Sequence, residues 1–138
     1  MGDSLELNAL KAAYKRWDDS KGTDASVWES LLADDVILKS MDSNHKALSF
    51  ATPRNGKQQV MQYLTDITSS WTMLHWTPEV YVCEGDRIAM FGKCGWTNKA
   101  TGKSAEVGTA HLWRFKSGRA VEYTELFDSA KVIAAGTP

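Results

Sequence analysis

Hydrophobic residues recur at helical spacing through the first half of the chain. Three sets follow one another mostly at intervals of three or four residues: Leu7, Leu10, Tyr14 and Trp17; Val27, Trp28, Leu31 and Leu32; and Val60, Leu64, Ile67 and Trp71. Such spacing places each set on one face of a helix. Gly22 can take a positive φ and ends the first helix. The pattern therefore predicts three helices, of which the second is short.

The segments between the helices are more polar. Asp34 and Asp35 end the second helix, and we expect a strand over residues 36–41. Residues 42–56 contain a proline and a glycine and are expected to form a loop, with a short strand at residues 47–50 as an option.

The second half of the chain changes to the alternating pattern of strands. Four strands are predicted, at residues 79–82, 88–97, 105–115 and 121–127, with short turns between them. Strands in series with short turns form an antiparallel meander. Helices followed by such a meander favour an α+β fold, in which a curved sheet packs against segregated helices. No linker or repeat divides the chain, so residues 1–138 are expected to form a single domain.

The register of the last two strands decides which polar residues meet. A turn with an even number of residues places His111 opposite Thr124, whereas a three-residue turn at residues 117–119 places it opposite Glu125. We favour the three-residue turn because it gives two favourable cross-strand pairs, Arg114 with Glu122 and Trp113 with Tyr123.

In this register one face of the hairpin is mostly aromatic and holds one His and one Glu. It carries Thr109, His111, Trp113, Phe115, Val121, Tyr123, Glu125 and Phe127. A His–Glu pair in such a setting can transfer protons. The alternative that stays open is a structural hydrogen bond that satisfies two buried polar groups.

Composition excludes several classes of partner. Sixteen Lys and Arg against seventeen Asp and Glu leave a net charge of −1, so no positive field attracts nucleic acid or an anionic membrane. No apolar run reaches the roughly 20 residues that span a bilayer. The chain holds six Trp. Together with the near-zero charge, these residues indicate a neutral, flat, apolar ligand.

The cysteines bear on compartment and on metals. A tight turn at residues 85–86 places Cys83 opposite a residue near 88 and far from Cys94, so two free thiols are expected. Because the three His are also dispersed, no metal site is expected. Residues 1–4 lack the basic patch and apolar stretch of a secretory leader. We therefore expect a cytoplasmic protein.

Two stretches of the sequence resemble a known family. Residues 28–36, Trp-Glu-Ser-Leu-Leu-Ala-Asp-Asp-Val, and residues 113–128, which close with Glu-Leu-Phe-Asp, are similar to the SnoaL-like polyketide cyclase family. This family lies within the superfamily of ketosteroid isomerase and nuclear transport factor two. The resemblance implies a cone, in which a strongly curved, mostly antiparallel sheet wraps three N-terminal helices around a pocket. It also implies a homodimer formed through the sheet.

The resemblance implies roles for the His–Glu pair. The cyclases carry a His on the penultimate strand and an acid fourteen residues later, and His111 and Glu125 have this separation. Glu125 then matches the general base and His111 the residue that orients or polarises the substrate. The base of ketosteroid isomerase would fall near Ser40, which cannot serve. The Arg and second Asp of limonene epoxide hydrolases would fall near Gly92 and Cys94, which cannot serve either.

The resemblance and the pattern together give a candidate pocket. Its expected substrate-binding residues are Tyr14, Trp17, Trp71, Thr109, Trp113, Tyr123 and Phe127. Tyr14 could donate a hydrogen bond to a substrate carbonyl. We expect an enzyme without cofactor that transfers protons on an apolar, cyclic or aromatic carbonyl compound. The alternative is a non-catalytic ligand-binding or dimerisation module with the same fold.

Overall fold

The computed structural model describes residues 4–41 and 43–138. Residues 1–3 lie outside the described residues, and so does residue 42 of the expected loop. The expectation of a cytoplasmic protein without a secretory leader rests partly on residues 1–3. No helix in the described ranges is long and apolar enough to cross a membrane.

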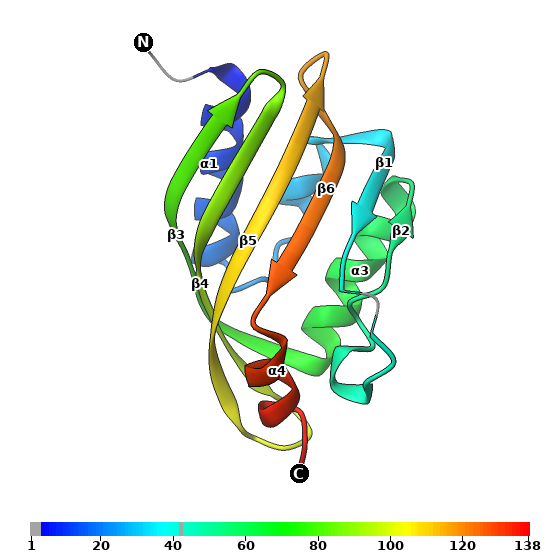
Figure 1. Cartoon of the computed structure of the whole chain (residues 1–138), viewed down its shortest axis with the longest axis vertical. Coiled ribbons are helices and arrows are strands. Elements are labelled where there is room, and N and C mark those ends of the chain that lie inside the picture. Colours follow the sequence, from blue (N-terminus) through cyan, green and yellow to red (C-terminus); the bar gives the residue numbers. More distant parts are fainter. Residues whose placement is uncertain (1–3, 42) are drawn as a thin grey trace.

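The described chain alternates helices and strands before a long meander (Figure 1). The elements in order are α1 (Leu5–Asp19), α2 (Ser26–Glu29), β1 (Leu32–Lys39), a 3₁₀ helix (Lys46–Leu48), β2 (Arg54–Asn55), α3 (Lys57–Ser70), β3 (Trp71–Glu84), β4 (Arg87–Asn98), β5 (Ser104–Lys116), β6 (Arg119–Phe127) and α4 (Ser129–Ala135).

The strands form one six-stranded sheet in the order β2-β1-β6-β5-β4-β3. β1 runs parallel to β6, and the other neighbouring strands are antiparallel. Figure 1 shows a curved sheet with α1 and α3 on one of its faces. The α+β class and the mostly antiparallel sheet are confirmed. The expectation of three N-terminal helices is not confirmed as stated, because the described residues form four α-helices, including α4 after the last strand.

Several predicted boundaries are wrong. Asp34 and Asp35 do not end a helix but lie inside β1, which begins at Leu32. Trp71 is not the last residue of a helix but the first of β3, which extends through residue 84. Residues 47–50 contain the end of a 3₁₀ helix and a turn, not a strand. The first two errors share one cause, since residues with weak intrinsic preference take the structure that the neighbouring strands of the sheet impose.

The pairing of β5 with β6 confirms the predicted register. His111 lies opposite Glu125, and Trp113 lies opposite Tyr123. The predicted three-residue turn, however, is wrong. Lys116 pairs with Arg119, so the turn has two residues.

Both residues of this turn, Ser117 and Gly118, have positive φ, at 53° and 79°. A two-residue hairpin turn of this kind matches the twist of the strands. A β-bulge restores the register that the short turn would have lost, because Phe115 pairs with Ala120 whereas Arg114 pairs with Glu122. As a result Ala120, rather than the predicted Val121, is buried beside Phe115.

The bend of β3 brings its backbone close to β4. The pairing of these strands is irregular between Met73 and His75 and again between Pro78 and Val80. At the second irregularity a Cβ on Gly92 would collide with the carbonyl oxygen of Thr77, so glycine permits the approach. The long strand can therefore curve over α1, which packs against it.

Candidate functional site

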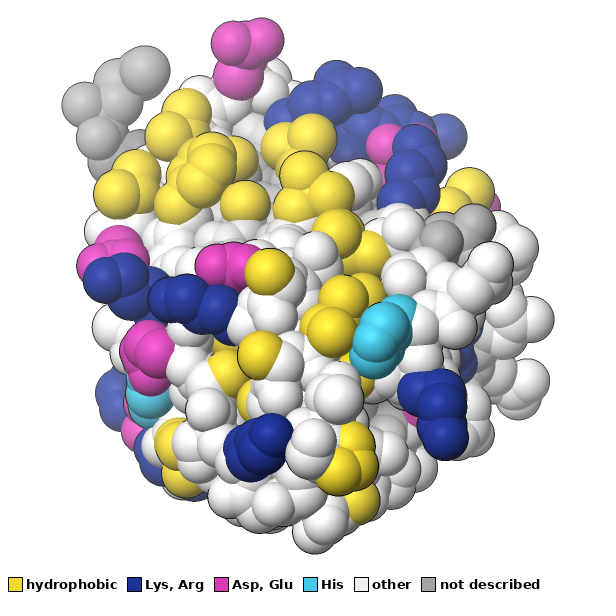
Figure 2. Space-filling view, turned by 60° about the horizontal axis from the view of Figure 1, so that its bottom comes forward, with side chains coloured by type: hydrophobic (Ala, Val, Ile, Leu, Met, Phe, Trp, Pro, Cys, Tyr) yellow, Lys and Arg dark blue, Asp and Glu magenta, His cyan; other side chains and the backbone are white. Residues whose placement is uncertain are grey.

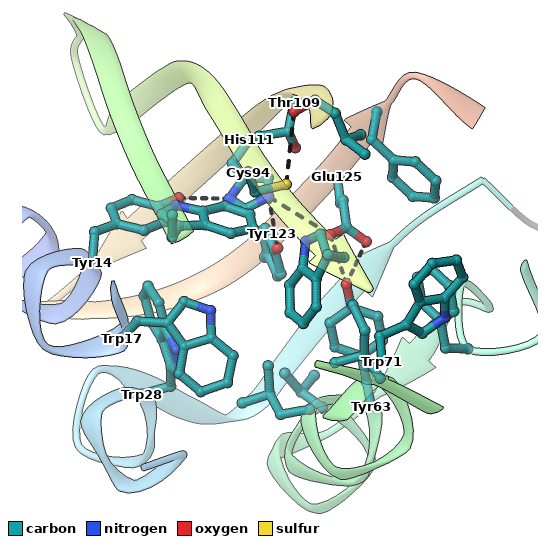
Figure 3. Close-up of a pocket in the computed structure, with 18 of the residues that line it drawn as sticks. Tyr14, Trp17, Trp28, Tyr63, Trp71, Cys94, Thr109, His111, Tyr123 and Glu125 are labelled. Atoms are coloured by element: carbon teal, nitrogen blue, oxygen red, sulfur yellow. Dashed lines mark hydrogen bonds and ion pairs between the residues drawn. The ribbon is translucent and has the colours of Figure 1, made fainter. Parts of the chain in front are cut away.

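A cavity of about 60 Å³ lies among the side chains of the sheet and the helices. The nine residues proposed from the sequence as catalytic or substrate-binding all line it: Tyr14, Trp17, Trp71, Thr109, His111, Trp113, Tyr123, Glu125 and Phe127. Figure 3 shows how residues from α1, α2 and α3 face those of the sheet across this space. The structure brings these residues together, and their roles in binding or catalysis stay predictions.

His111 and Glu125 form the polar centre of the cavity. They lie directly opposite each other on β5 and β6, and their side chains point to the same face of the sheet. Nε2 of His111 is 3.6 Å from Oε1 of Glu125. Only 4% of His111 and 5% of Glu125 is exposed. Two groups that transfer protons therefore lie within reach of each other and of a bound molecule.

A chain of hydrogen bonds fixes the imidazole of His111. The Tyr14 hydroxyl lies 2.6 Å from Nδ1 of His111 and 2.8 Å from Nε1 of Trp113. An indole N–H can only donate, so the Tyr14 oxygen accepts from Trp113. The Tyr14 proton has no other acceptor in the described hydrogen bonds, so we assign it to Nδ1. The neutral imidazole then carries its proton on Nε2, which faces the Tyr123 hydroxyl at 3.1 Å and Glu125.

The Tyr14 hydroxyl already has a partner in the protein. It is hydrogen-bonded to His111, and its expected role toward a substrate carbonyl stays a prediction. Burial, the largest cause, raises the pKa of Tyr14 well above its usual value, so the phenol keeps the proton that it donates. In the described structure Tyr14 contacts His111 and thereby holds its ring in place.

Glu125 has two hydroxyl partners that the sequence did not reveal. Tyr63, on α3, lies 2.6 Å from both carboxylate oxygens, and Ser40, just after β1, donates to Oε2 at 3.2 Å. Burial and the neighbouring carboxylate raise the pKa of Tyr63, so this phenol also remains a donor. A signal for Tyr63 existed, because it lies on the α3 face that carries Val60 and Leu64, and a buried phenol requires a partner.

The remaining walls of the cavity are aromatic. Trp113 stacks between Tyr123, with ring centroids 4.2 Å apart, and Trp28, at 5.5 Å. Trp28 and Trp76 also line the cavity and were missed as site residues. Trp28 had been recognised only as a residue of the helical core. These flat surfaces suit a planar molecule.

The cysteines of the described residues offer no reactive thiolate to the cavity. Burial raises the pKa of Cys94 to about 12, so this cavity residue is a thiol rather than a nucleophilic thiolate. Both cysteines are free, and Cys83 is exposed. Within residues 4–41 and 43–138, no three His, Cys, Asp or Glu side chains lie together as a metal site would require.

Solved structures with the same fold are similar to this chain over nearly its whole length. An NTF2-like protein of unknown function from Burkholderia pseudomallei K96243 is 23% identical with a TM-score of 0.82, covering 99% of this chain and 100% of that one. A protein from Mesorhizobium loti, provisionally described as a SnoaL-like polyketide cyclase, is 20% identical with a TM-score of 0.72, covering 89% and 99%.

A third structure has a ligand in its description. TerC co-crystallized with polyporic acid is 19% identical to this chain with a TM-score of 0.79, covering 96% of this chain and 98% of that one. At these identities the three structures establish the fold. No curated protein matches the sequence.

The family follows from the sequence match rather than from the structures. The model of the SnoaL-like domain matches residues 10–123, which include the larger part of α1, most of the sheet and His111, and end before Glu125. This match covers well over half of the chain and agrees with the NTF2-like fold of the similar structures. The chain therefore belongs to the SnoaL-like domain family.

Proposed function

We propose that the protein is an enzyme that removes and returns a proton next to the carbonyl group of a small cyclic or aromatic compound, without a cofactor. The observation that carries this proposal is the Glu125 carboxylate, which is buried on the cavity wall, bound by Tyr63 and 3.6 Å from the imidazole of His111. A positioned carboxylate beside an imidazole is suited to general acid–base catalysis.

The proposed step moves one proton. A carboxylate oxygen of Glu125 takes the proton from a C–H bond next to the carbonyl, and the electron pair of that bond becomes the double bond of an enolate. Negative charge then develops on the substrate oxygen, where the Nε2–H of His111 can donate to it. Return of the proton from Glu125 to the same or another carbon completes an exchange, isomerisation or cyclisation.

Two further observations support this class of substrate. The cavity walls are mostly apolar and aromatic, as a flat ring compound would require. Among structures with this fold, one is described as a SnoaL-like polyketide cyclase and another was co-crystallized with polyporic acid. The substrate of this chain is therefore proposed to be a planar carbonyl compound.

One observation favours the second candidate, a non-catalytic ligand-binding or dimerisation module with the same fold. The cavity of about 60 Å³ is smaller than the roughly 300–1,000 Å³ of most small-molecule sites, because aromatic side chains occupy much of the space. Ile67 and Phe127 are the half-buried members of the lining. For either function, a ligand larger than the cavity requires side chains of the lining to move, and these two are the least buried.

Proton exchange tests the proposal without knowledge of the natural substrate. We expect the protein to accelerate replacement of the hydrogens next to the carbonyl of 1-indanone by deuterium in D₂O, followed by NMR. The variant Glu125→Gln should lower this rate by about 100-fold or more, since it removes the base. Glu122→Gln is the matched control, because it lies on the same strand, faces Arg114 and does not line the cavity.

The outcomes separate the two candidates. A rate that Glu125→Gln leaves unchanged contradicts the assignment of the base. Saturable binding of 1-indanone with no exchange above the buffer rate favours the binding module. Exchange that Glu125→Gln removes and Glu122→Gln retains supports the enzyme.

We also propose that the protein forms a homodimer through the outer face of the sheet. Figure 2 shows hydrophobic side chains gathered on this side of the molecule. The exposed residues on this face are Val80, Val82, Phe91, Leu112 and Leu126, and they come from four neighbouring strands. A contiguous apolar patch of this kind is typical of an interface.

Sedimentation tests the dimer. The variant Leu112→Lys should be a monomer, whereas the wild-type protein should be a dimer. A wild-type protein that is itself monomeric would contradict the proposal.

A further inference from the structure

Two buried hydrogen-bond donors on the cavity wall have no acceptor. The indole N–H groups of Trp28, on α2, and Trp76, on β3, are shielded from solvent and have no hydrogen-bond partner among the described residues. The two side chains are 5% and 6% exposed, and both line the cavity. Trp113 differs, because its indole N–H is bound to Tyr14. Buried donors are nearly always paired in native proteins, so each of the two requires an explanation.

The two indoles flank the catalytic candidates. Trp28 contacts the Tyr14 ring edge-on, with centroids 5.1 Å apart, and Trp76 stacks on Tyr14 at 6.0 Å. The ring of Trp76 also lies 5.1 Å from that of His111. Figure 3 shows Trp28 and Tyr14 on the same side of the cavity. A molecule in contact with His111 and Glu125 therefore also lies near the rings that carry these unpaired donors.

The lining restricts what can pair with them. Among the described residues of the cavity wall there is no Lys or Arg, so no fixed positive charge is available to balance a carboxylate or phosphate. An indole N–H donates to neutral acceptors such as carbonyl and hydroxyl oxygens. A neutral ring compound that carries such oxygens matches both the apolar walls and the unpaired donors.

We infer that Trp28 and Trp76 bind two separate acceptor oxygens of the substrate, an inference that rests on the proposed function and narrows its substrate class. The substrate is then a flat ring compound with at least two oxygens that accept hydrogen bonds, such as a dicarbonyl or a hydroxylated ketone. Trp76 binds the acceptor on the side of His111, and Trp28 binds the acceptor nearer to α2.

A series of three probes with one ring system tests the inference. Indane has no acceptor oxygen, 1-indanone has one and 1,3-indandione has two. Their affinities are measured by calorimetry at a pH below the pKa of 1,3-indandione, so that all three are uncharged. Each neutral hydrogen bond should raise affinity by about twofold to tenfold. The expected order is therefore 1,3-indandione, then 1-indanone, then indane.

Matched substitutions locate the two bonds. Trp28→Phe and Trp76→Phe keep an aromatic ring but remove the N–H, and each should reduce the advantage of 1,3-indandione over indane by about twofold to tenfold. Trp17→Phe is the control, because Trp17 contacts Trp28 and lines the same cavity but is not among the buried unpaired donors. It should change the affinities for all three probes alike and preserve their ratio.

An NMR measurement on the unaltered protein avoids dependence on the folding of the variants. The indole N–H signals of Trp28 and Trp76 should shift downfield with 1,3-indandione and much less with indane. Signals that respond equally to both probes, or affinities that do not rise with the number of oxygens, overturn the inference. Failure of all three probes to bind overturns it as well.

The binding series tests recognition by Trp28 and Trp76, and the exchange assay tests the proposed base, so their outcomes can be told apart. If acceptor oxygens raise affinity but Glu125→Gln leaves exchange unchanged, the proposed base is wrong and the recognition by Trp28 and Trp76 stands. If exchange depends on Glu125 but affinity does not change with the number of acceptor oxygens, the proposed enzyme activity is supported and this inference is wrong.

Discussion

The imidazole of His111 is held so that one of its two nitrogens faces the cavity with a proton. Tyr14 donates to Nδ1, and Trp113 in turn donates to Tyr14. Both contacts are buried and connect residues about a hundred positions apart in the sequence. The orientation of the imidazole is therefore set by α1 as much as by the strand that carries it. Residues that fix a tautomer in this way can affect a reaction without contact with the substrate.

Removal of the Tyr14 hydroxyl should release this constraint. In Tyr14→Phe the buried Nδ1 of His111 and the N–H of Trp113 lose their common partner, so the free energy of unfolding should fall by about 1–3 kcal/mol. The ¹⁵N shifts of the imidazole should change from a single Nε2–H form to a mixture of tautomers. Tyr81→Phe is the control, because Tyr81 lies near Tyr14 but has no hydrogen bond to His111. An unchanged tautomer in Tyr14→Phe would contradict the assigned chain of donors.

At the level of elements, the sequence predicts the class of the fold and the pairing of His111 with Glu125. It does not predict the turn geometry that produces this pairing. The prediction obtained the register from a three-residue turn, whereas the structure uses a two-residue turn and a bulge at Val121. The favourable cross-strand pair of Arg114 with Glu122 constrains only the final register. A three-residue turn, or a two-residue turn with a bulge, gives the same register. Tyr63 escaped prediction because its contact with Glu125 depends on where α3 packs.

The hairpin turn gives a prediction with opposite signs at adjacent positions. Ser117 has a φ of 53°, where Asn is better tolerated, so Ser117→Asn should raise the unfolding free energy by a few tenths to about 1 kcal/mol. Gly118 has a φ of 79°, which a Cβ disfavours, so Gly118→Ala should lower it by about 1 kcal/mol. Denaturant unfolding measures both. Equal effects at the two positions would be inconsistent with a turn of this geometry.

The contact between α1 and β3 should depend on pH. The Asp18 carboxylate accepts from the backbone N–H of Trp76 at 2.8 Å. Burial alone would raise the pKa of Asp18, but hydrogen bonds from Trp76 and Lys21 outweigh it and hold this pKa below its usual value. A depressed carboxyl pKa adds stability above the unfolded pKa of about 4, and this stability is lost as the pH falls through the folded value.

Asp18→Asn should therefore cost up to about 1 kcal/mol at neutral pH, a modest value because a third of the side chain is exposed. The difference from the wild-type protein should shrink as the pH falls below about 4. Asp19→Asn is the control, since Asp19 forms an exposed ion pair with Lys15 and has no contact with β3 in the described hydrogen bonds. A stability difference that does not vary with pH would argue against an ionised Asp18.

At the scale of the whole molecule, most of the tyrosines lie in the interior. Three of the four tyrosines, Tyr14, Tyr63 and Tyr123, are fully buried around the cavity, and burial raises their pKa well above the usual value. Partial burial raises the pKa of Tyr81 to about 12. Since all four favour the protonated form in the folded state, their stabilising effect is complete below the unfolded pKa of about 10 and is lost as the pH rises above it.

Alkaline titration should therefore be cooperative. Below a pH of about 10 the folded protein should show little tyrosinate absorbance at the wavelength where ionised phenols absorb. At higher pH this absorbance should appear together with loss of the far-ultraviolet circular dichroism, because the buried phenols ionise only as the chain unfolds. The variant Tyr81→Phe should leave that coincidence intact. A gradual titration near pH 10 in a fully folded protein would mean that the phenols are accessible.

The indole that ends the Trp113–Tyr14–His111 chain also limits how protons travel between the site and bulk water. An indole N–H donates but cannot accept, so no relay continues beyond Trp113 toward the far side of the molecule. A hydroxyl can do both, and among the described partners of Glu125, Ser40 is half-buried whereas Tyr63 is enclosed. Under the proposed function, Ser40 at the end of β1 is therefore the expected route by which Glu125 exchanges a proton with bulk water.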